Sequence, residues 1–207
     1  MRTITITKNV YAYDELSESA KQKVKDWYLP MRNDDFSDYV NHNVKYLFDG
    51  ADVKVQYSLS YCQGDGLNIY GKVYAEDIFN ALAKSDKYTI LEKYADAMTD
   101  AEQDTILYYA GLCNDIELPY NRNYCYCMAD YINFADDWRD SLEWEDYENI
   151  DIVTIHKFEN LVQDIFNTLC SDYENDGYEY LYEINDEEMQ ETCEANEWEF
   201  YEDGTIF

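Results

Sequence analysis

The C-terminal segment of the chain, Ala129 to Phe207, combines a high negative charge with many aromatic side chains. It contains 25 acidic residues and two basic ones, Arg139 and Lys157, which gives a net charge of −23. Acidic tails usually stay disordered, but disorder requires few aromatic and branched apolar residues. This segment contains Trp138, Trp144, Phe158, Phe166, Trp198 and Phe200. We therefore expect it to fold and to carry a concentrated negative surface that suits a basic partner.

The charge divides the chain into two halves. Residues 1–128 hold 13 basic and 20 acidic residues and form a mixed α+β half with nearly balanced charge, whereas residues 129–207 form a strongly acidic α+β half. No Pro- or Gly-rich linker separates the halves, and such linkers usually mark domain boundaries. We expect the two halves to pack together as one compact unit.

The apolar periodicity predicts an α+β fold, in which small antiparallel sheets and hairpins pack with several amphipathic helices. Helices are expected behind Ser17 as an N-cap, over about 34–48, as a pair within 76–112, at 155–169 and at 185–194. Thr99 and Glu102 have the spacing of a capping box that begins the second helix of the pair. Strands are expected at 3–7, 53–61, 67–74 and 123–134, with two short strands in 198–207.

Several features place the protein in the cytoplasm. The first residues alternate polar and apolar side chains, unlike a signal peptide, and no stretch of 18 apolar residues occurs. Its six cysteines are therefore expected to be reduced: Cys62, Cys113, Cys125, Cys127, Cys170 and Cys193. The net charge of −30 argues against direct binding to nucleic acid or to an anionic membrane, because both would repel it. No cofactor is expected.

Residues 172–203 form the candidate partner-binding surface, because this stretch holds 14 acidic side chains and no basic one. If residues 183–194 are helical, their six carboxylates give roughly one charge per 3 Å, close to the phosphate spacing of about 3.4 Å along one DNA strand. A solvated face kept acidic for solubility is the alternative. The candidate acidic residues are Asp172, Glu174, Asp176, Glu179, Glu183, Asp186, Glu187, Glu188, Glu191, Glu194, Glu197, Glu199, Glu202 and Asp203. The candidate aromatic anchors are Tyr178, Tyr180, Tyr182, Trp198 and Tyr201.

Residues 172–183 also resemble the calcium loop of EF-hands, with acidic residues at loop positions one, three, five and twelve and Gly177 at position six. The loop departs from the usual pattern at position three, which is Glu174, and at position eight, which is the charged Glu179. A calcium-responsive binding module is therefore an alternative function. Its candidate ligands are Asp172, Glu174, Asp176, Tyr178 and Glu183.

The remaining motifs are better explained as structural elements than as binding or catalytic sites. Gly64-Asp65-Gly66 runs into a strand, so it indicates a hairpin turn rather than a phosphate cradle. Cys125 and Cys127 lack a second close pair and lie on one face of an expected strand, which is poor zinc spacing. Neither His42 nor His156 has a recognisable catalytic context. Among 45 acidic residues a catalytic carboxylate pair would not stand out, so an enzyme of unknown chemistry is a further alternative.

The chain resembles the small, very acidic proteins with which phages and other mobile elements block bacterial defence nucleases, namely anti-CRISPR proteins and DNA-mimic antirestriction proteins. The likeness lies in size, charge asymmetry and tyrosine-rich strands, in Leu16-Ser-Glu-Ser-Ala-Lys21, and in the hairpin Tyr57-Ser-Leu-Ser-Tyr-Cys-Gln-Gly-Asp-Gly66. It implies a non-enzymatic inhibitor that occupies the basic channel of a host nucleic-acid-binding protein, such as a Cas9-type CRISPR effector or a restriction enzyme. Because these inhibitors share no general motif, the resemblance assigns no individual residue.

Overall fold

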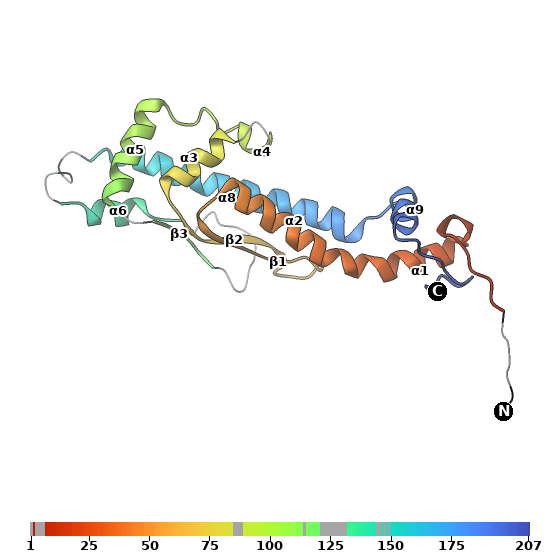
Figure 1. The fold of residues 1–207 in the computed structure, drawn as a ribbon. Helices are drawn as coiled ribbons and strands as arrows, with labels where there is room; N and C mark the ends of the chain where they lie inside the picture. The colour runs from red at the N-terminus through yellow and green to blue at the C-terminus, as the bar shows by residue number, and fades with distance from the viewer. Residues whose placement is uncertain are drawn as a thin grey trace. The chain divides into compact units, whose positions relative to one another are not determined.

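The computed structural model describes residue 2 and residues 7–84, 89–113, 115–120, 132–143, 146, 148 and 150–207. The chain is an α+β protein, as the periodicity predicts, with a three-stranded antiparallel sheet and several helices (Figure 1). Its contacts define two compact units. The terminal unit contains Met1–Ser37 and Gly177–Phe207, and the central unit contains Asp38–Asp176. The expected division by charge at residues 128 and 129 falls outside the described residues and stays a prediction.

Two α-helices precede a β-hairpin, and further helices lie before and after a third strand. The α-helices are α1 (Glu18–Tyr28), α2 (Arg32–Leu47), α3 (Ala75–Ala83), α4 (Thr89–Glu92), α5 (Asp100–Leu112), α6 (Ala135–Ser141), α8 (Ile152–Tyr182) and α9 (Asp186–Ala195). Two 3-10 turns are η1 (Tyr13–Glu15) and η2 (Leu29–Met31), and the strands are β1 (Asp52–Ser58), β2 (Gly66–Val73) and β3 (Ile116–Leu118). Helices α2 and α8 each contribute residues to both units. In the described part of the chain, no helix has the combination of length and apolar character needed to cross a bilayer.

The β1–β2 hairpin confirms the prediction from alternating side chains. β1 pairs antiparallel with β2, so that Val55 lies opposite Ile69, and β2 pairs antiparallel with β3. The Asp65 carboxylate organises the turn, because it accepts hydrogen bonds from the Ser58 hydroxyl at 2.9 Å and from the Cys62 backbone N–H at 2.7 Å. Burial opposes the ionisation of Asp65, but these hydrogen bonds outweigh it and lower its pKa to about 2. Gly64-Asp65-Gly66 is thus a hairpin turn, as expected.

Helix α8 provides much of the core of the central unit. Its Phe166 stacks on Phe48 with ring centroids 5.0 Å apart, and its Phe158 stacks on Phe79 from α3 at 5.2 Å. The rings of Phe48, Phe158 and Phe166 are fully buried, and that of Phe79 is partly buried. This packing accounts for the strong apolar stripe that predicts a helix at 155–169. The structure extends that helix in both directions.

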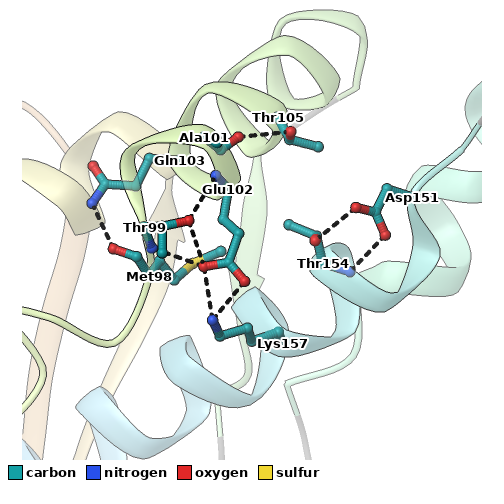
Figure 2. A network of polar contacts seen from close by, with 9 residues as sticks. All are labelled: Met98, Thr99, Ala101, Glu102, Gln103, Thr105, Asp151, Thr154 and Lys157. Carbon is teal, nitrogen blue, oxygen red and sulfur yellow. Dashed lines mark hydrogen bonds and ion pairs between the residues drawn. The ribbon is translucent and has the colours of Figure 1, made fainter.

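A polar network joins α5 to α8 within the central unit (Figure 2). The Thr99 hydroxyl accepts from the Glu102 N–H at 3.4 Å, and the Glu102 carboxylate accepts from the Thr99 N–H at 2.8 Å, which is the predicted capping box. The Lys157 ammonium donates to Glu102 at 2.6 Å, and this bond lowers the pKa of Glu102 to about 2. Lys157 is one of only two basic residues after Met128. Its charge is therefore neutralised by an acidic residue from the first half of the sequence.

The core of the terminal unit joins the two ends of the chain. Buried side chains from η1 and α1 pack against buried side chains from α9 and the last residues, namely Tyr13, Leu16, Ala20, Val24, Met189, Cys193 and Phe200. Ser17 caps α1 as predicted, accepting from the Ala20 N–H. Phe200 forms β-bridges to Tyr11 and Ile206, so the expected C-terminal strands are reduced to single bridges. The turn between Phe200 and Ile206 approaches α1 closely, so that a Cβ atom on Gly204 would clash with the carbonyl oxygen of Ala20.

Several sequence predictions fall outside the described residues. They are most of the strand at 3–7, most of the strand at 123–134, and the pair Cys125 and Cys127. His156 lies near the start of α8, 3.4 Å from the Glu159 carboxylate. His42 is exposed on α2.

Candidate functional site

The calcium-loop prediction is wrong, because the expected loop is helical. Helix α8 runs without interruption from Ile152 to Tyr182, and Gly177 is buried within it. An EF-hand requires a sharp turn at that glycine, so that successive ligands converge on one ion. In the described ranges, no group of three or more His, Cys, Asp or Glu side chains is arranged to hold a metal ion. This overturns the proposed ligand set of Asp172, Glu174, Asp176, Tyr178 and Glu183.

Two carboxylates of that segment are instead partly buried on the helix surface. Burial raises the pKa of Asp172, and the nearby Asp176 raises it further. Burial also raises the pKa of Glu174, with a smaller contribution from Asp65 in the hairpin turn. Both residues belong to the central unit. Their charge is therefore less available to a partner than the sequence suggests.

The expected row of six carboxylates from Glu183 to Glu194 is also interrupted. Helix α8 ends at Tyr182, and α9 begins after Asn185, whose side chain caps it by accepting from the Glu188 N–H at 2.8 Å. Glu183 thus belongs to neither helix and does not continue the row of carboxylates on α9. Helix α9 itself agrees with the predicted range of 185–194.

Three acidic residues of the terminal unit form ion pairs with basic residues from the start of the chain. Asp186 lies 2.5 Å from the Lys25 ammonium, Glu188 lies 2.9 Å from the Arg32 guanidinium, and Asp203 lies 2.9 Å from the Lys23 ammonium. The bond from Lys25 is the main cause that lowers the pKa of Asp186. The bond from Lys23 is the main cause that lowers the pKa of Asp203 to about 2. These three carboxylates are paired within the terminal unit, and their expected role in partner binding stays a prediction.

The charge is less uneven in the fold than along the sequence. Residues 1–37 contain six basic and six acidic residues, and residues 177–207 add eleven acidic residues and no basic one. The terminal unit therefore has a net charge of −11, and the central unit, which is about twice as long, has the remaining −19. Relative to their lengths, the two units carry similar net charge. The sequence could not reveal this, because it separates partners that are 156 to 180 positions apart.

Helix α9 of the terminal unit carries an exposed stripe of carboxylates. Glu187, Glu191 and Glu194 are all exposed and share one side of the helix, while Met189 and Cys193 are buried on the other side. None of the three forms an ion pair with any described residue. Their charges lie about 5 Å apart along the helix axis, compared with about 3.4 Å for the phosphates of one DNA strand. We call Glu187, Glu191 and Glu194 the α9 acidic stripe.

The remaining carboxylates of residues 177–207 also lack a basic partner among the described residues. They are Glu179, Glu183, Glu197, Glu199 and Glu202, and all are exposed. Together with the α9 acidic stripe, they leave eight of the eleven acidic residues of this segment without an ion pair. Most of the negative charge on residues 177–207 is therefore not neutralised by a described basic residue.

No family model, curated protein or solved structure matches this chain. The case for a function therefore depends on the chain's own residues and their geometry.

The predicted aromatic anchors divide into two groups. Trp198 packs edge-on against Trp27 at 5.1 Å, and the Tyr180 ring lies under the Arg32 guanidinium at 3.8 Å. These two rings help to hold the terminal unit together, and their expected role as partner anchors stays a prediction. The rings of Tyr178 and Tyr182 lie 6.2 Å apart on α8, and Tyr201 lies under the Lys8 ammonium at 4.4 Å. Of the five, Tyr182 is exposed to the greatest extent.

The carboxylates predict a stability maximum in mildly acidic solution. Because the pKa values of Asp172 and Glu174 are raised in the folded state, their ionisation opposes folding at neutral pH, and protonation removes this cost as the pH falls. The lowered pKa values of Asp186 and Asp203 act in the opposite sense: their ion pairs stabilise the fold above about pH 4, and each is lost as the pH falls through the lowered pKa, which is about 2 for Asp203. The free energy of unfolding should rise from pH 7 to about 4.5 and fall below about 4.

Urea denaturation followed by circular dichroism at each pH measures this profile. The variant Lys23→Met removes the partner of Asp203. The free energy of unfolding should then fall less steeply below about pH 4, while its rise from pH 7 to about 4.5 stays unchanged. A free energy of unfolding that falls steadily from pH 7 downwards would contradict the prediction.

Proposed function

We propose that this protein is a non-enzymatic inhibitor whose acidic surface occupies the basic nucleic-acid-binding channel of a bacterial defence nuclease. A Cas9-type effector or a restriction enzyme is the class of target, and the cytoplasm of a bacterial host is the compartment. The α9 acidic stripe carries the proposal, because Glu187, Glu191 and Glu194 are exposed and lack ion-pair partners among the described residues. This bare stripe favours a partner that supplies the missing positive charges.

The stripe is not what stability alone would select. Like charges at i,i+4, as in Glu187 and Glu191, destabilise a helix by about 0.2–0.5 kcal/mol per pair. Lysines at the start of the chain neutralise Asp186 and Asp203, so the fold provides counter-charges for some carboxylates and leaves the stripe without them. A negative surface of this kind attracts a positively charged channel and accelerates association.

The alternative explanation, an acidic face kept for solubility, makes a different prediction about binding. A solubility face has no preferred partner, and its effect depends on net charge rather than on which carboxylates carry it. A docking surface depends on particular positions. The two explanations can therefore be separated by variants that change equal charge at different positions.

Affinity capture from bacterial lysate tests the proposal. The full chain is immobilised beside a variant in which Glu187, Glu191 and Glu194 are replaced by Gln, and bound proteins are eluted with rising salt and identified. We expect a nucleic-acid-binding protein that the unchanged chain retains at low salt and the variant does not. The purified target should then lose nuclease activity when the unchanged chain is added. Equal retention by both chains, or a target whose activity is unaffected, would contradict the proposal.

A further inference from the structure

A hollow of about 360 Å³ opens on the terminal unit, between η1 and the end of α9. This volume lies near the lower end of the range of about 300–1,000 Å³ that is typical of pockets for small molecules. Its apolar lining comes from Tyr13, Cys193 and Trp198, and its acidic lining includes Glu194, Glu197 and Glu199. Each lining residue belongs to the terminal unit. The hollow thus combines an aromatic wall with several carboxylates.

The carboxylates of the hollow are available to a ligand. Glu197 and Glu199 are exposed and form no ion pair with any described residue, and Glu194 only accepts a hydrogen bond from Gln190 at 2.8 Å. Glu197 has a left-handed backbone with φ of 55°, which turns the chain directly after α9. The Trp198 N–H then bonds back to the Cys193 carbonyl at 2.9 Å. This turn fixes Glu197 and Trp198 at the same hollow.

The Cys193 side chain forms part of the apolar floor of the hollow. It is only 3% exposed, it lines the hollow, and its thiol makes no hydrogen bond within the described part of the chain. Burial raises the pKa of the thiol to about 11, so the sulfur is neutral at physiological pH. A buried neutral cysteine packs as a small apolar residue, so Cys193 joins the hollow to the core of the terminal unit.

We propose that the hollow receives one arginine side chain of the basic partner. An arginine has an apolar stem that packs against an aromatic wall, and a planar guanidinium that stacks on Trp or Tyr and donates up to five hydrogen bonds. The half-buried Trp198 ring suits the stem and the guanidinium plane, and the glutamates supply acceptors in a form that favours charge-assisted bonds. Lysine, a point charge without a stacking plane, fits this arrangement less well.

This inference rests on the proposed function and adds the side chain by which the partner is recognised. Its test uses the full chain and short peptides, so it does not require the partner to be known. Labelled protein is titrated with acetyl-Gly-Arg-Gly-amide, with the matching lysine peptide, and with the matching citrulline peptide, in which the guanidinium is replaced by a neutral urea group. The signal followed by NMR is the indole N–H of Trp198. We expect it to shift with the arginine peptide, weakly with lysine, and not with citrulline. Equal shifts with arginine and citrulline, or no shift with arginine, would overturn the proposal.

Two matched variants test the position of the site. Glu197→Gln with Glu199→Gln changes the hollow, and Glu187→Gln with Glu191→Gln removes the same charge from the same unit outside it. We expect the first variant to lose about tenfold in affinity for a hexa-arginine peptide and the second to lose about threefold or less, since hydrogen bonds to charged groups exceed general charge effects. Equal losses would overturn the arginine hollow while leaving the docking surface in place. Unchanged affinity in both variants would overturn the hollow and count against the proposed function as well.

Discussion

Replacement of Glu187, Glu191 and Glu194 together by lysine should weaken binding to the captured target by about a hundredfold or more, with the fold unchanged. The substitutions replace three attractive charges by three repulsive ones on a helix face whose carboxylates form no ion pair with any described residue, and like charges across an interface cost several kcal/mol. Each of these residues is exposed, so little core packing is altered. Calorimetric titration measures the affinity, and circular dichroism measures the fold.

The control reverses Asp34, Asp35 and Asp38. These residues are also exposed, also lie on one helix, α2, and give the same change in net charge. Their reversal should weaken binding by about tenfold or less, since it acts only through the general field of the protein. Equal losses from the two triple variants would show that the target responds to net charge, and the α9 acidic stripe would lose its assigned role.

The second large effect concerns stability. Arg32→Ala should lower the free energy of unfolding by about 2 kcal/mol, since the buried guanidinium loses a hydrogen bond to a carbonyl, a charge-assisted bond to the half-exposed Glu188 and its contact with an aromatic ring. The Arg32 side chain is 5% exposed, and its guanidinium donates to the Glu183 carbonyl at 3.1 Å and to the Glu188 carboxylate at 2.9 Å. It also stacks on the Tyr180 ring at 3.8 Å. The substitution therefore breaks a link between the start of α2 and the segment that joins α8 to α9.

Two further variants make this prediction specific. Arg32→Lys keeps the charge but loses the second donor and the stacking plane, so it should recover only a minor part of the stability. Arg139→Ala removes a more exposed arginine that pairs with Asp136 and Asp140, and it should cost less than about 1 kcal/mol. Denaturation in urea compares the three. Similar losses for Arg32→Ala and Arg139→Ala would show that the buried link contributes no more than a surface pair.

The parts of the fold that depend on neighbouring residues could be predicted from the sequence. Ser17 as an N-cap and the capping box of Thr99 and Glu102 use contacts three positions apart, and the β1–β2 hairpin joins two strands that are adjacent in the sequence. The same is true of α9, which begins after its Asn185 cap. Such signals are local, so a single sequence contains them.

Contacts between distant segments could not be predicted in this way. Lys23 and Asp203 are 180 positions apart, and nothing in either segment indicates the other. As a result the acidic C-terminal segment looked isolated, although lysines at the start of the chain neutralise part of it. The short strand β3 is a similar case, because only its pairing with β2 identifies it.

The calcium-loop error had a signal in the sequence that could have prevented it. The apolar positions Phe166, Leu169, Cys170, Tyr173 and Gly177 continue at helical spacing through the supposed loop, and the structure buries all five. Helical spacing of apolar residues indicates a helix more strongly than a match to acidic positions does in a segment so rich in carboxylates. The acidic pattern reflects composition rather than a ligand set.

Competition with DNA on the captured target tests the central claim most directly. Labelled duplex DNA is bound to the target, this protein is added, and fluorescence anisotropy reports the bound DNA at about 50 and 300 mM salt, a range over which contacts between charges weaken strongly. If the acidic surface occupies the nucleic-acid channel, the protein should displace the DNA, added DNA should displace the protein in return, and the affinity should fall steeply at the higher salt. DNA that stays bound in a ternary complex, or an affinity unchanged between the two salt concentrations, would contradict the account.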